Sequence, residues 1–165
     1  MGWLFMNWIK SYQDMANHIL QDTSHKAIAK ALVGSTFYVA YERVDDEGKK
    51  DVYIGVFLIS RNKGEFGYKD MTENCGPCYY TCPERILKLS TQTSKFSVEW
   101  RAACREYIRR KEAWGNFTKG LNYGAKLSRD DGSELTFHSV LSKKYVACIN
   151  PEGKIYKYDF TQIVF

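Results

Sequence analysis

The apolar run from Val52 to Ile59 is the feature that most constrains the fold of this 165-residue chain. Apart from Gly55, every residue in the run is apolar, and most are β-branched or aromatic. Such a run is typical of a strand that is covered on both faces. Residues 36–41 have the same character, and the polar residues 45–50 separate the two segments. The sequence therefore predicts a hairpin whose second strand is central in a sheet.

Helical spacing of apolar residues predicts a helix over 8–20, and the segment before it, 2–6, reads as a strand or as the first turn of that helix. Thr81 and Glu84 fit a capping box, with Thr81 as the N-cap. This box predicts a short helix that ends near Leu89.

A second, longer helix is predicted from about Ser97 to Trp114. Its apolar residues recur at offsets that place them on one stripe of the helix. The members of this stripe are Trp100, Ala103, Cys104, Tyr107, Ile108 and Trp114.

The last third of the chain predicts antiparallel strands at 134–141, 144–149 and 154–160, joined by turns rich in Asp, Asn and Gly. The expected fold class is α+β, with an antiparallel sheet, two central helices and a small C-terminal β-barrel-like sheet. We expect a single domain over 1–165, with a hinge at the glycine-containing segment 115–124 before the C-terminal β subdomain.

No apolar stretch is long enough for a transmembrane helix, and the beginning of the chain lacks the features of a signal peptide. We therefore expect a cytoplasmic protein with no membrane partner. In a reducing cytoplasm the five cysteines are thiols or metal ligands rather than a disulfide framework.

Residues 75–78 spell Cys-Gly-Pro-Cys, the tetrad of thioredoxins. A redox pair of this kind requires a helix that begins at its first cysteine, because the helix dipole lowers the pKa of that thiol. Here the helix-start signal comes later, at Thr81, and Asn74 replaces the aromatic residue expected before the tetrad. The only proline that follows Pro83 is Pro151, in a predicted turn. Dithiol redox chemistry is therefore disfavoured.

Zinc is a second interpretation of this segment. Cys75, Cys78 and Cys82 would supply three thiolates to a tetrahedral site. The candidates for a fourth ligand are His25, His138 and Cys148. The third interpretation is a proline-stiffened loop that leads into the helix, and it is the one the pattern favours. It needs no cofactor.

The predicted helix over 97–114 also carries a row of basic residues, spaced four apart. Such a row could follow a phosphate backbone while aromatic residues beside it stack on bases. The candidate binding residues are Arg101, Arg105, Arg109, Arg110, Lys111, Tyr107 and Trp114. Acidic residues are interleaved with the row, which is also typical of a solvated helix face.

No catalytic or nucleotide-binding motif is present: the sequence has no P-loop, no Gly-x-Gly-x-x-Gly after a strand and no His-Glu-x-x-His. The three histidines occur in unrelated contexts. Nothing assembles a nucleophile, a base and an orienting group, so the sequence does not predict an enzyme.

Four segments form a recognisable set: Phe-Gly-Tyr-Lys-Asp-Met at 66–71, residues 75–83, Leu-Lys-Leu at 87–89 and Glu-Trp-Arg-Ala-Ala-Cys-Arg at 99–105. They resemble a family of small uncharacterised proteins carried by bacteriophages and conjugative elements. Residues 1–3, 33–38 and 131–134 are similar as well. The resemblance implies a mobile-element accessory protein in a bacterial cytoplasm and carries no assigned activity.

The leading hypothesis is a binding module that engages nucleic acid or a host nucleoprotein, in a counter-defence role, through the basic helix. The rival is a zinc- or thiol-dependent protein centred on Cys75, Cys78 and Cys82. A structural or oligomerisation role is the third alternative.

Overall fold

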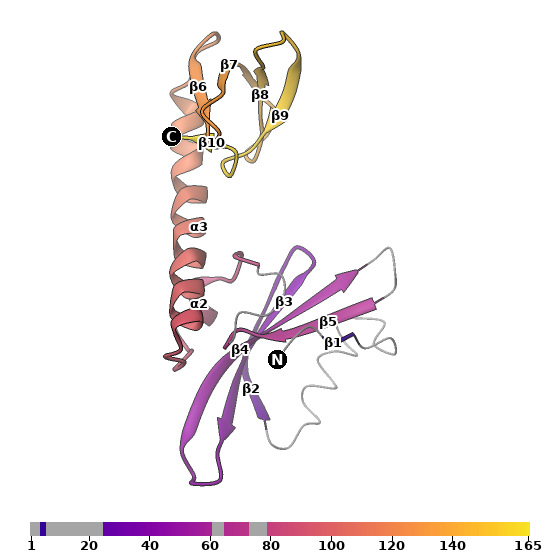
Figure 1. Cartoon of the computed structure of the whole chain (residues 1–165), viewed down its shortest axis with the longest axis vertical. Coiled ribbons are helices and arrows are strands. Elements are labelled where there is room, and N and C mark those ends of the chain that lie inside the picture. The colour runs from indigo at the N-terminus through magenta and orange to yellow at the C-terminus, as the bar shows by residue number, and fades with distance from the viewer. Residues whose placement is uncertain (1–3, 6–24, 61–64, 73–78) are drawn as a thin grey trace. The chain divides into compact units, whose positions relative to one another are not determined.

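The computed structural model describes residues 4–5, 25–60, 65–72 and 79–165. The chain divides into two compact units, residues 1–106 and 107–165. Each unit contains an antiparallel sheet, and the described residues are mostly strand with few helices, which is compatible with the predicted α+β class (Figure 1). The two central helices of that prediction are not shown. The predicted helix over 8–20 lies outside the described residues.

The boundary between the units falls inside helix α3 (Lys95–Lys119). It therefore precedes the segment 115–124, where the sequence predicted a hinge, and the first residues of that segment belong to the helix. The single domain and its hinge stay predictions.

The first unit contains a sheet of five strands in the order β1-β5-β4-β3-β2. The strands are β1 (Leu4–Phe5), β2 (His25–Val33), β3 (Thr36–Val44), β4 (Lys50–Ser60) and β5 (Glu65–Asp70). β4 lies between β3 and β5, and its successive residues Tyr53 and Ile54 are both buried. Successive residues of a strand point to opposite faces, so the prediction of a central strand that is covered on both sides is confirmed.

Residue patterns contained no signal for β2, which is rich in alanine and lysine. These residues are depleted in strands, so propensity alone argues against this strand. Its pairing with β3 starts at a two-residue turn in which Gly34 has a φ of +61°. Glycine tolerates this conformation, and the tight turn makes β2 the antiparallel neighbour of β3.

One face of β3 packs against the segment that carries the helices. The Tyr38 hydroxyl lies 2.7 Å from Oγ1 of Thr81. The predicted capping box is therefore wrong: α2 (Glu84–Leu87) begins after Pro83, with no side-chain cap. Thr81 hydrogen-bonds to the sheet instead of the helix, because Tyr38 is fully buried and its hydroxyl requires a partner.

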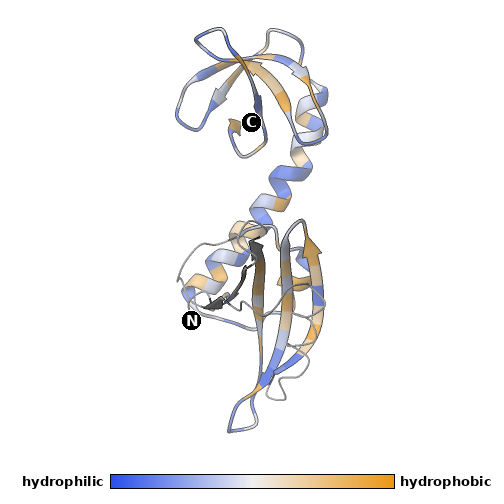
Figure 2. Cartoon of the chain, turned by 90° about the vertical axis from the view of Figure 1, so that its right-hand side faces the viewer, coloured by the Kyte–Doolittle hydropathy of each residue, from blue (hydrophilic) through white to orange (hydrophobic). Residues whose placement is uncertain are grey.

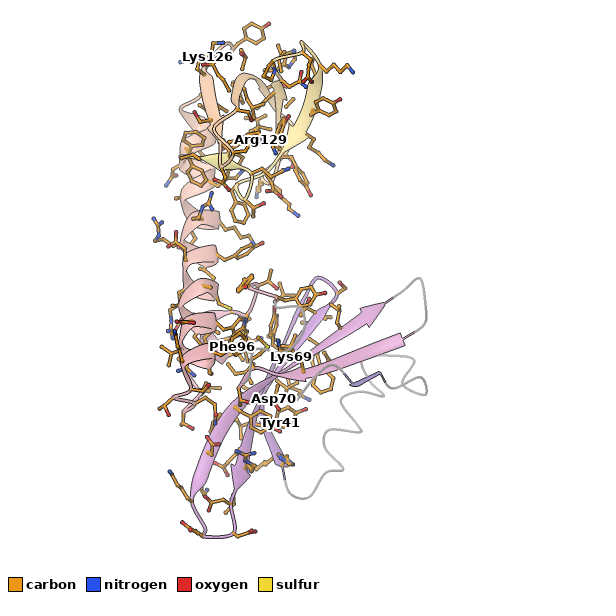
Figure 3. The ribbon with its side chains drawn as sticks, viewed as in Figure 1. Tyr41, Lys69, Asp70, Phe96, Lys126 and Arg129 are labelled. Atoms are coloured by element: carbon orange, nitrogen blue, oxygen red, sulfur yellow. The ribbon has the colours of Figure 1, made fainter. Side chains whose placement is uncertain are left out.

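The beginning of α3 is fastened to the same unit by three contacts. Oγ of Ser94 accepts from the Ser97 amide at 3.2 Å and donates to the Thr72 carbonyl at 2.7 Å. The buried Lys69 ammonium lies 5.1 Å from the centre of the Phe96 ring, and both residues are labelled in Figure 3. The helix therefore starts at a fixed place on the sheet.

The second unit contains a sheet in the order β10-β6-β7-β8-β9. Its strands are β6 (Lys126–Arg129), β7 (Glu134–Val140), β8 (Val146–Ile149), β9 (Ile155–Tyr158) and β10 (Ile163–Val164). β9 and β10 are the two edges, so within residues 107–165 the sheet is open. Figure 2 shows that the hydrophobic colouring lies mainly on the strands and the hydrophilic colouring on the loops.

The inner face of this second sheet packs against α3. The buried cluster contains Trp114 of the helix with Leu135, Phe137, Val146 and Ile163 of the strands. The outer face, as we call it below, is the face of the second sheet that points away from this cluster. Because side chains alternate along a strand, the residues between the core positions lie on the outer face.

Candidate nucleic-acid interface

The predicted row of arginines is divided between the two units. Arg101 and Arg105 belong to the first unit, and Arg109 belongs to the second. The spacing of four residues does place them along one helix, as the sequence predicted. Their contacts, however, differ from one residue to the next.

Arg101 holds the loop that precedes α3. Its guanidinium donates to Oγ of Ser90 at 2.6 Å, to the Gln92 carbonyl at 2.7 Å and to Oγ of Ser97 at 3.3 Å. Partial burial, followed by the nearby charge of Arg105, lowers the pKa of Arg101 from its ordinary value. These three contacts occupy the side chain with the protein's own acceptors.

Arg105 forms a two-point ion pair with Glu84 of α2. The Nε and Nη2 atoms lie 2.9 and 3.0 Å from the two carboxylate oxygens. Hydrogen bonding to Glu84 is the main cause that raises the pKa of Arg105. The geometry is the planar, bidentate one that arginine also uses for phosphate, and here the carboxylate takes that place.

The remaining residues of the helix patch pack into the second unit. Arg110 donates to the carbonyl oxygens of Phe160 at 2.6 Å and Ile163 at 3.0 Å. Tyr107 meets the Phe160 ring edge-on, with centroids 5.0 Å apart. Trp114 is 1% exposed, so it is not available to stack on a base. Within the second unit, Trp114 belongs to the buried cluster of the sheet, and Tyr107 packs against that cluster.

Arg109 and Lys111 are the basic residues of the predicted set that are exposed within the second unit. They are two positions apart, so they point to different sides of the helix, and two such cations attract a polyanion only weakly. The helix therefore has fewer basic side chains available for a nucleic acid than its sequence suggested. The sheet of the same unit has a better candidate.

Residues 107–165 contain ten Lys and Arg against six Asp and Glu, a net charge of +4 out of the +5 of the whole chain. Two of these lysines gather on one aromatic ring. Nζ of Lys157 lies 4.4 Å from the centre of the Tyr145 ring, and Nζ of Lys144 lies 5.0 Å from it. We call these three residues the Lys-Tyr-Lys cluster.

The strand register explains the Lys-Tyr-Lys cluster. Lys157 of β9 pairs with Ala147 of β8. Tyr145 precedes Ala147 by two residues, so it projects to the same side, and diagonal neighbours of this kind are within reach of long side chains. Val146 and Tyr158, on the other side, are in the buried core. The cluster therefore lies on the outer face. The predicted strands at 144–149 and 154–160 contain all three residues of the cluster, but the sequence does not show the register in which the strands pair.

One ammonium group of the cluster, that of Lys144, has a shifted pKa. Hydrogen bonding to the Tyr145 side chain is the main cause that raises the pKa of Lys144, and the nearby Asp159 contributes to it. The Asp159 carboxylate also accepts from the Thr161 amide at 2.9 Å, so part of its hydrogen-bonding capacity is taken.

Other cations of this unit already have carboxylate partners. On β6, Lys126 lies 2.8 Å from Glu134, and Arg129 lies 3.0 Å from Asp131 (Figure 3 labels Lys126 and Arg129). These pairs neutralise much of the charge at that side of the sheet. The Lys-Tyr-Lys cluster differs from these pairs, because its two lysines lie against an aromatic ring.

The described cysteines are all buried. Cys82, Cys104 and Cys148 are free thiols with no exposed surface. Burial is the main cause that raises the pKa of Cys82, which favours the neutral thiol over the thiolate that binds metal. Cys75 and Cys78 lie outside the described residues. The described part of the chain contains no group of three or more side chains able to hold a metal ion, and the zinc site stays a prediction.

No helix among the described residues is sufficiently long and apolar to cross a membrane. Comparisons of the chain with protein-family models, with curated proteins and with solved structures found no match.

Proposed function

We propose that this chain is a nucleic-acid-binding accessory protein of a mobile element, which acts in the bacterial cytoplasm on nucleic acid or on a host nucleoprotein, in a counter-defence role. The observation that supports the binding is the Lys-Tyr-Lys cluster, in the unit that carries most of the net charge. The mobile-element context follows from the sequence resemblance.

The chemistry of the cluster suits a single-stranded nucleic acid. Ammonium groups attract the phosphates, and a tyrosine ring offers an apolar surface that any base can contact. Neither of these contacts reads the edge of a base, which is where a sequence is recognised. We therefore expect affinity with little preference for sequence.

Fluorescence anisotropy with labelled single- and double-stranded DNA and RNA, at several salt concentrations, tests the proposal. Replacing Lys144 and Lys157 together by Gln should reduce the slope of log affinity against log salt by about 1.5, because two phosphate contacts are lost. The matched control replaces Lys119 and Lys126 by Gln, which removes the same charge from the same unit. Equal losses in both double variants would refute the cluster as the interface.

Tyr145 gives a second test that does not change the charge. Tyr145→Leu should weaken binding to a single strand by roughly tenfold, because stacking on a base is lost. Tyr145→Phe keeps the ring and should bind as the unchanged protein does. If Phe and Leu weaken binding equally, the ring does not stack on a base.

The proposal includes neither catalysis nor a bound metal. Elemental analysis of the purified protein checks the second point. Stoichiometric zinc that is lost in a Cys82→Ser variant would instead support the alternative, a zinc-dependent protein built on Cys75, Cys78 and Cys82.

A further inference from the structure

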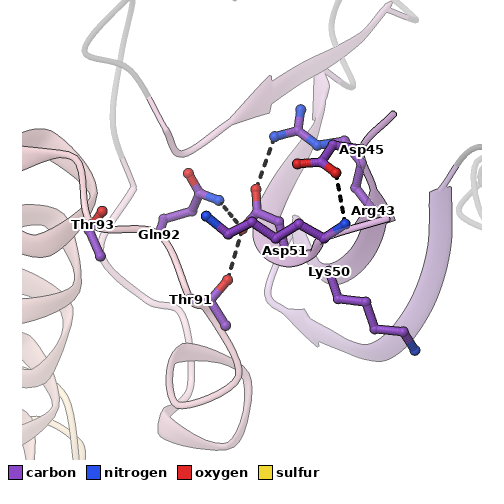
Figure 4. Close-up of a pocket in the computed structure, with 8 residues that line it drawn as sticks. Arg43, Asp45, Lys50, Asp51, Thr91, Gln92 and Thr93 are labelled. Carbon is purple, nitrogen blue, oxygen red and sulfur yellow. Dashed lines mark hydrogen bonds and ion pairs between the residues drawn. The ribbon is translucent and has the colours of Figure 1, made fainter. Parts of the chain in front are cut away.

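A cavity of about 360 Å³ lies in the first unit, beside the hairpin that joins β3 and β4 (Figure 4). Its other wall is the loop 91–93, which leads into α3. The volume is within the range of sites for small ligands. All of the lining residues belong to the first unit, so the cavity is separate from the Lys-Tyr-Lys cluster.

The two walls are held together by Asp51. Its carboxylate accepts from the Thr91 hydroxyl at 2.8 Å, from Nε2 of Gln92 at 2.5 Å and from Nη2 of Arg43 at 2.9 Å. The Thr91 amide also donates to the Val52 carbonyl at 2.9 Å, which adds to this connection. The cavity is therefore formed before any ligand arrives, and this lowers the cost of binding.

Both carboxylates that line the cavity accept hydrogen bonds from the protein. Burial alone would raise the pKa of Asp51, but hydrogen bonds from Thr91, Gln92 and Arg43 lower it below its ordinary value, so the group stays ionised and occupied. Oδ1 of Asp45 accepts from the amides of Glu47 at 3.1 Å and Lys49 at 2.8 Å, and thereby shapes the turn.

The donors at the cavity exceed these acceptors. Three cations line it, of which Arg43 pairs with Asp51 and Lys50 pairs with Glu42 at 3.3 Å. Within the described residues, the Lys49 ammonium has no carboxylate partner. Thr93 also lines this space. In addition, α3 begins two residues after Thr93, and the positive end of its dipole favours an anion.

We propose that this cavity binds a phosphate group, either as inorganic phosphate or as part of a phosphorylated small molecule. Lys49 supplies the positive charge that has no carboxylate partner, Arg43 supplies further N–H donors, and hydrogen bonding to Asp51 holds Arg43 in place. A divalent cation does not fit the site, because three cations line it and Asp51 already accepts three hydrogen bonds from the protein.

Nuclear magnetic resonance with the ¹⁵N-labelled full chain tests this inference. Titration with inorganic phosphate, at ionic strength held constant with chloride, should shift the amides of residues 45–51 and 91–93 in a saturable way. Lys49→Gln should weaken this binding by roughly tenfold, because a charge-assisted hydrogen bond is lost. The matched control is Lys30→Gln, an equal change of charge at an exposed position of β2 in the same unit.

Parallel titrations with a nucleoside 5′-monophosphate and with the same nucleoside distinguish the sources of the phosphate. Tighter binding of the monophosphate than of inorganic phosphate would assign the site to a phosphorylated small molecule, and equal binding would assign it to phosphate itself. Binding of the nucleoside alone, shifts without saturation, or equal effects of Lys49→Gln and Lys30→Gln would each overturn the inference. The Lys144/Lys157 double variant should bind phosphate normally, so failure here and failure of the proposed function are distinguishable.

Discussion

The guanidinium of Arg105 and the carboxylate of Glu84 form a two-point ion pair, with nitrogen–oxygen distances of 2.9 and 3.0 Å. The pair joins α2 to α3 inside the first unit. Arg105 belongs to the row of arginines that the sequence suggested for binding phosphate, but its partner in the structure is a carboxylate of the protein. We therefore expect Arg105 to contribute to the stability of the first unit and not to the binding of nucleic acid.

Replacing Arg105 by Gln should lower the free energy of unfolding by roughly 0.5–1 kcal/mol, because both partners of the ion pair are about half exposed and solvent screens them. Glu84→Gln should have a similar effect, and the double variant should lose little more than either single one. Urea denaturation measures all three. Nucleic-acid affinity should be unchanged, and a loss as large as that of the Lys144/Lys157 variant would return the interface to the helix.

Trp114 should act through stability rather than through binding. Trp114→Ala removes the centre of the buried cluster in the second unit and should cost about 3–5 kcal/mol. Trp114→Phe, which keeps an aromatic ring, should cost less. Thermal unfolding followed by circular dichroism measures both. A Phe variant with unchanged thermal stability but weaker nucleic-acid binding would show that the indole contacts the ligand.

The buried thiols predict a stability that falls at high pH. Burial raises the pKa of Cys148 from 9.0 to about 11. A thiol with a raised pKa stabilises the folded state fully below the pKa of the unfolded chain, and this contribution is lost as the pH rises from about 9 through 11. The free energy of unfolding should therefore decrease over this range.

The pKa values of Cys82 and Tyr38 are also raised, chiefly by burial, so they add to the same trend. Cys148→Val should make the decrease shallower without abolishing it. Alkylation of native protein at pH 8, followed by mass spectrometry, should leave the peptides with Cys82, Cys104 and Cys148 unmodified. Rapid modification of any of these three would contradict their burial.

Asp159 lies close enough to the Lys-Tyr-Lys cluster to raise the pKa of Lys144, so it should repel an approaching phosphate. Asp159→Asn keeps an acceptor for Thr161 and should strengthen nucleic-acid binding roughly two- to fivefold at low ionic strength. Asp130→Asn, an equal change in the turn after β6, is the control. The gain should vanish at high salt, and equal gains in both variants would mean that only the net charge matters.

Part of the fold could be read directly from residue patterns. The apolar run at 52–59 specifies a strand that is covered on both faces, and the helical spacing around Trp100 and Cys104 specifies which side of α3 is buried. These predictions succeed because hydrophobic periodicity reports local geometry, and burial of apolar surface is the largest favourable contribution to folding. The strand β2 was missed for the opposite reason, since its alanines and lysines carry no such signal.

The candidate site depended on partners that are distant in the sequence. Thr81 bonds to Tyr38, 43 residues away, and not to the helix it precedes. Spacing along α3 aligns Arg101 and Arg105 but does not show that Ser90 and Glu84 occupy them. Lys157 meets Tyr145 only because β8 and β9 pair in one particular register. The sequence by itself determined that residues 52–59 form a covered strand and that α3 is a helix with one buried side. Only the tertiary structure decided which charges stay available, because each polar side chain bonds to whatever partner the fold brings within reach.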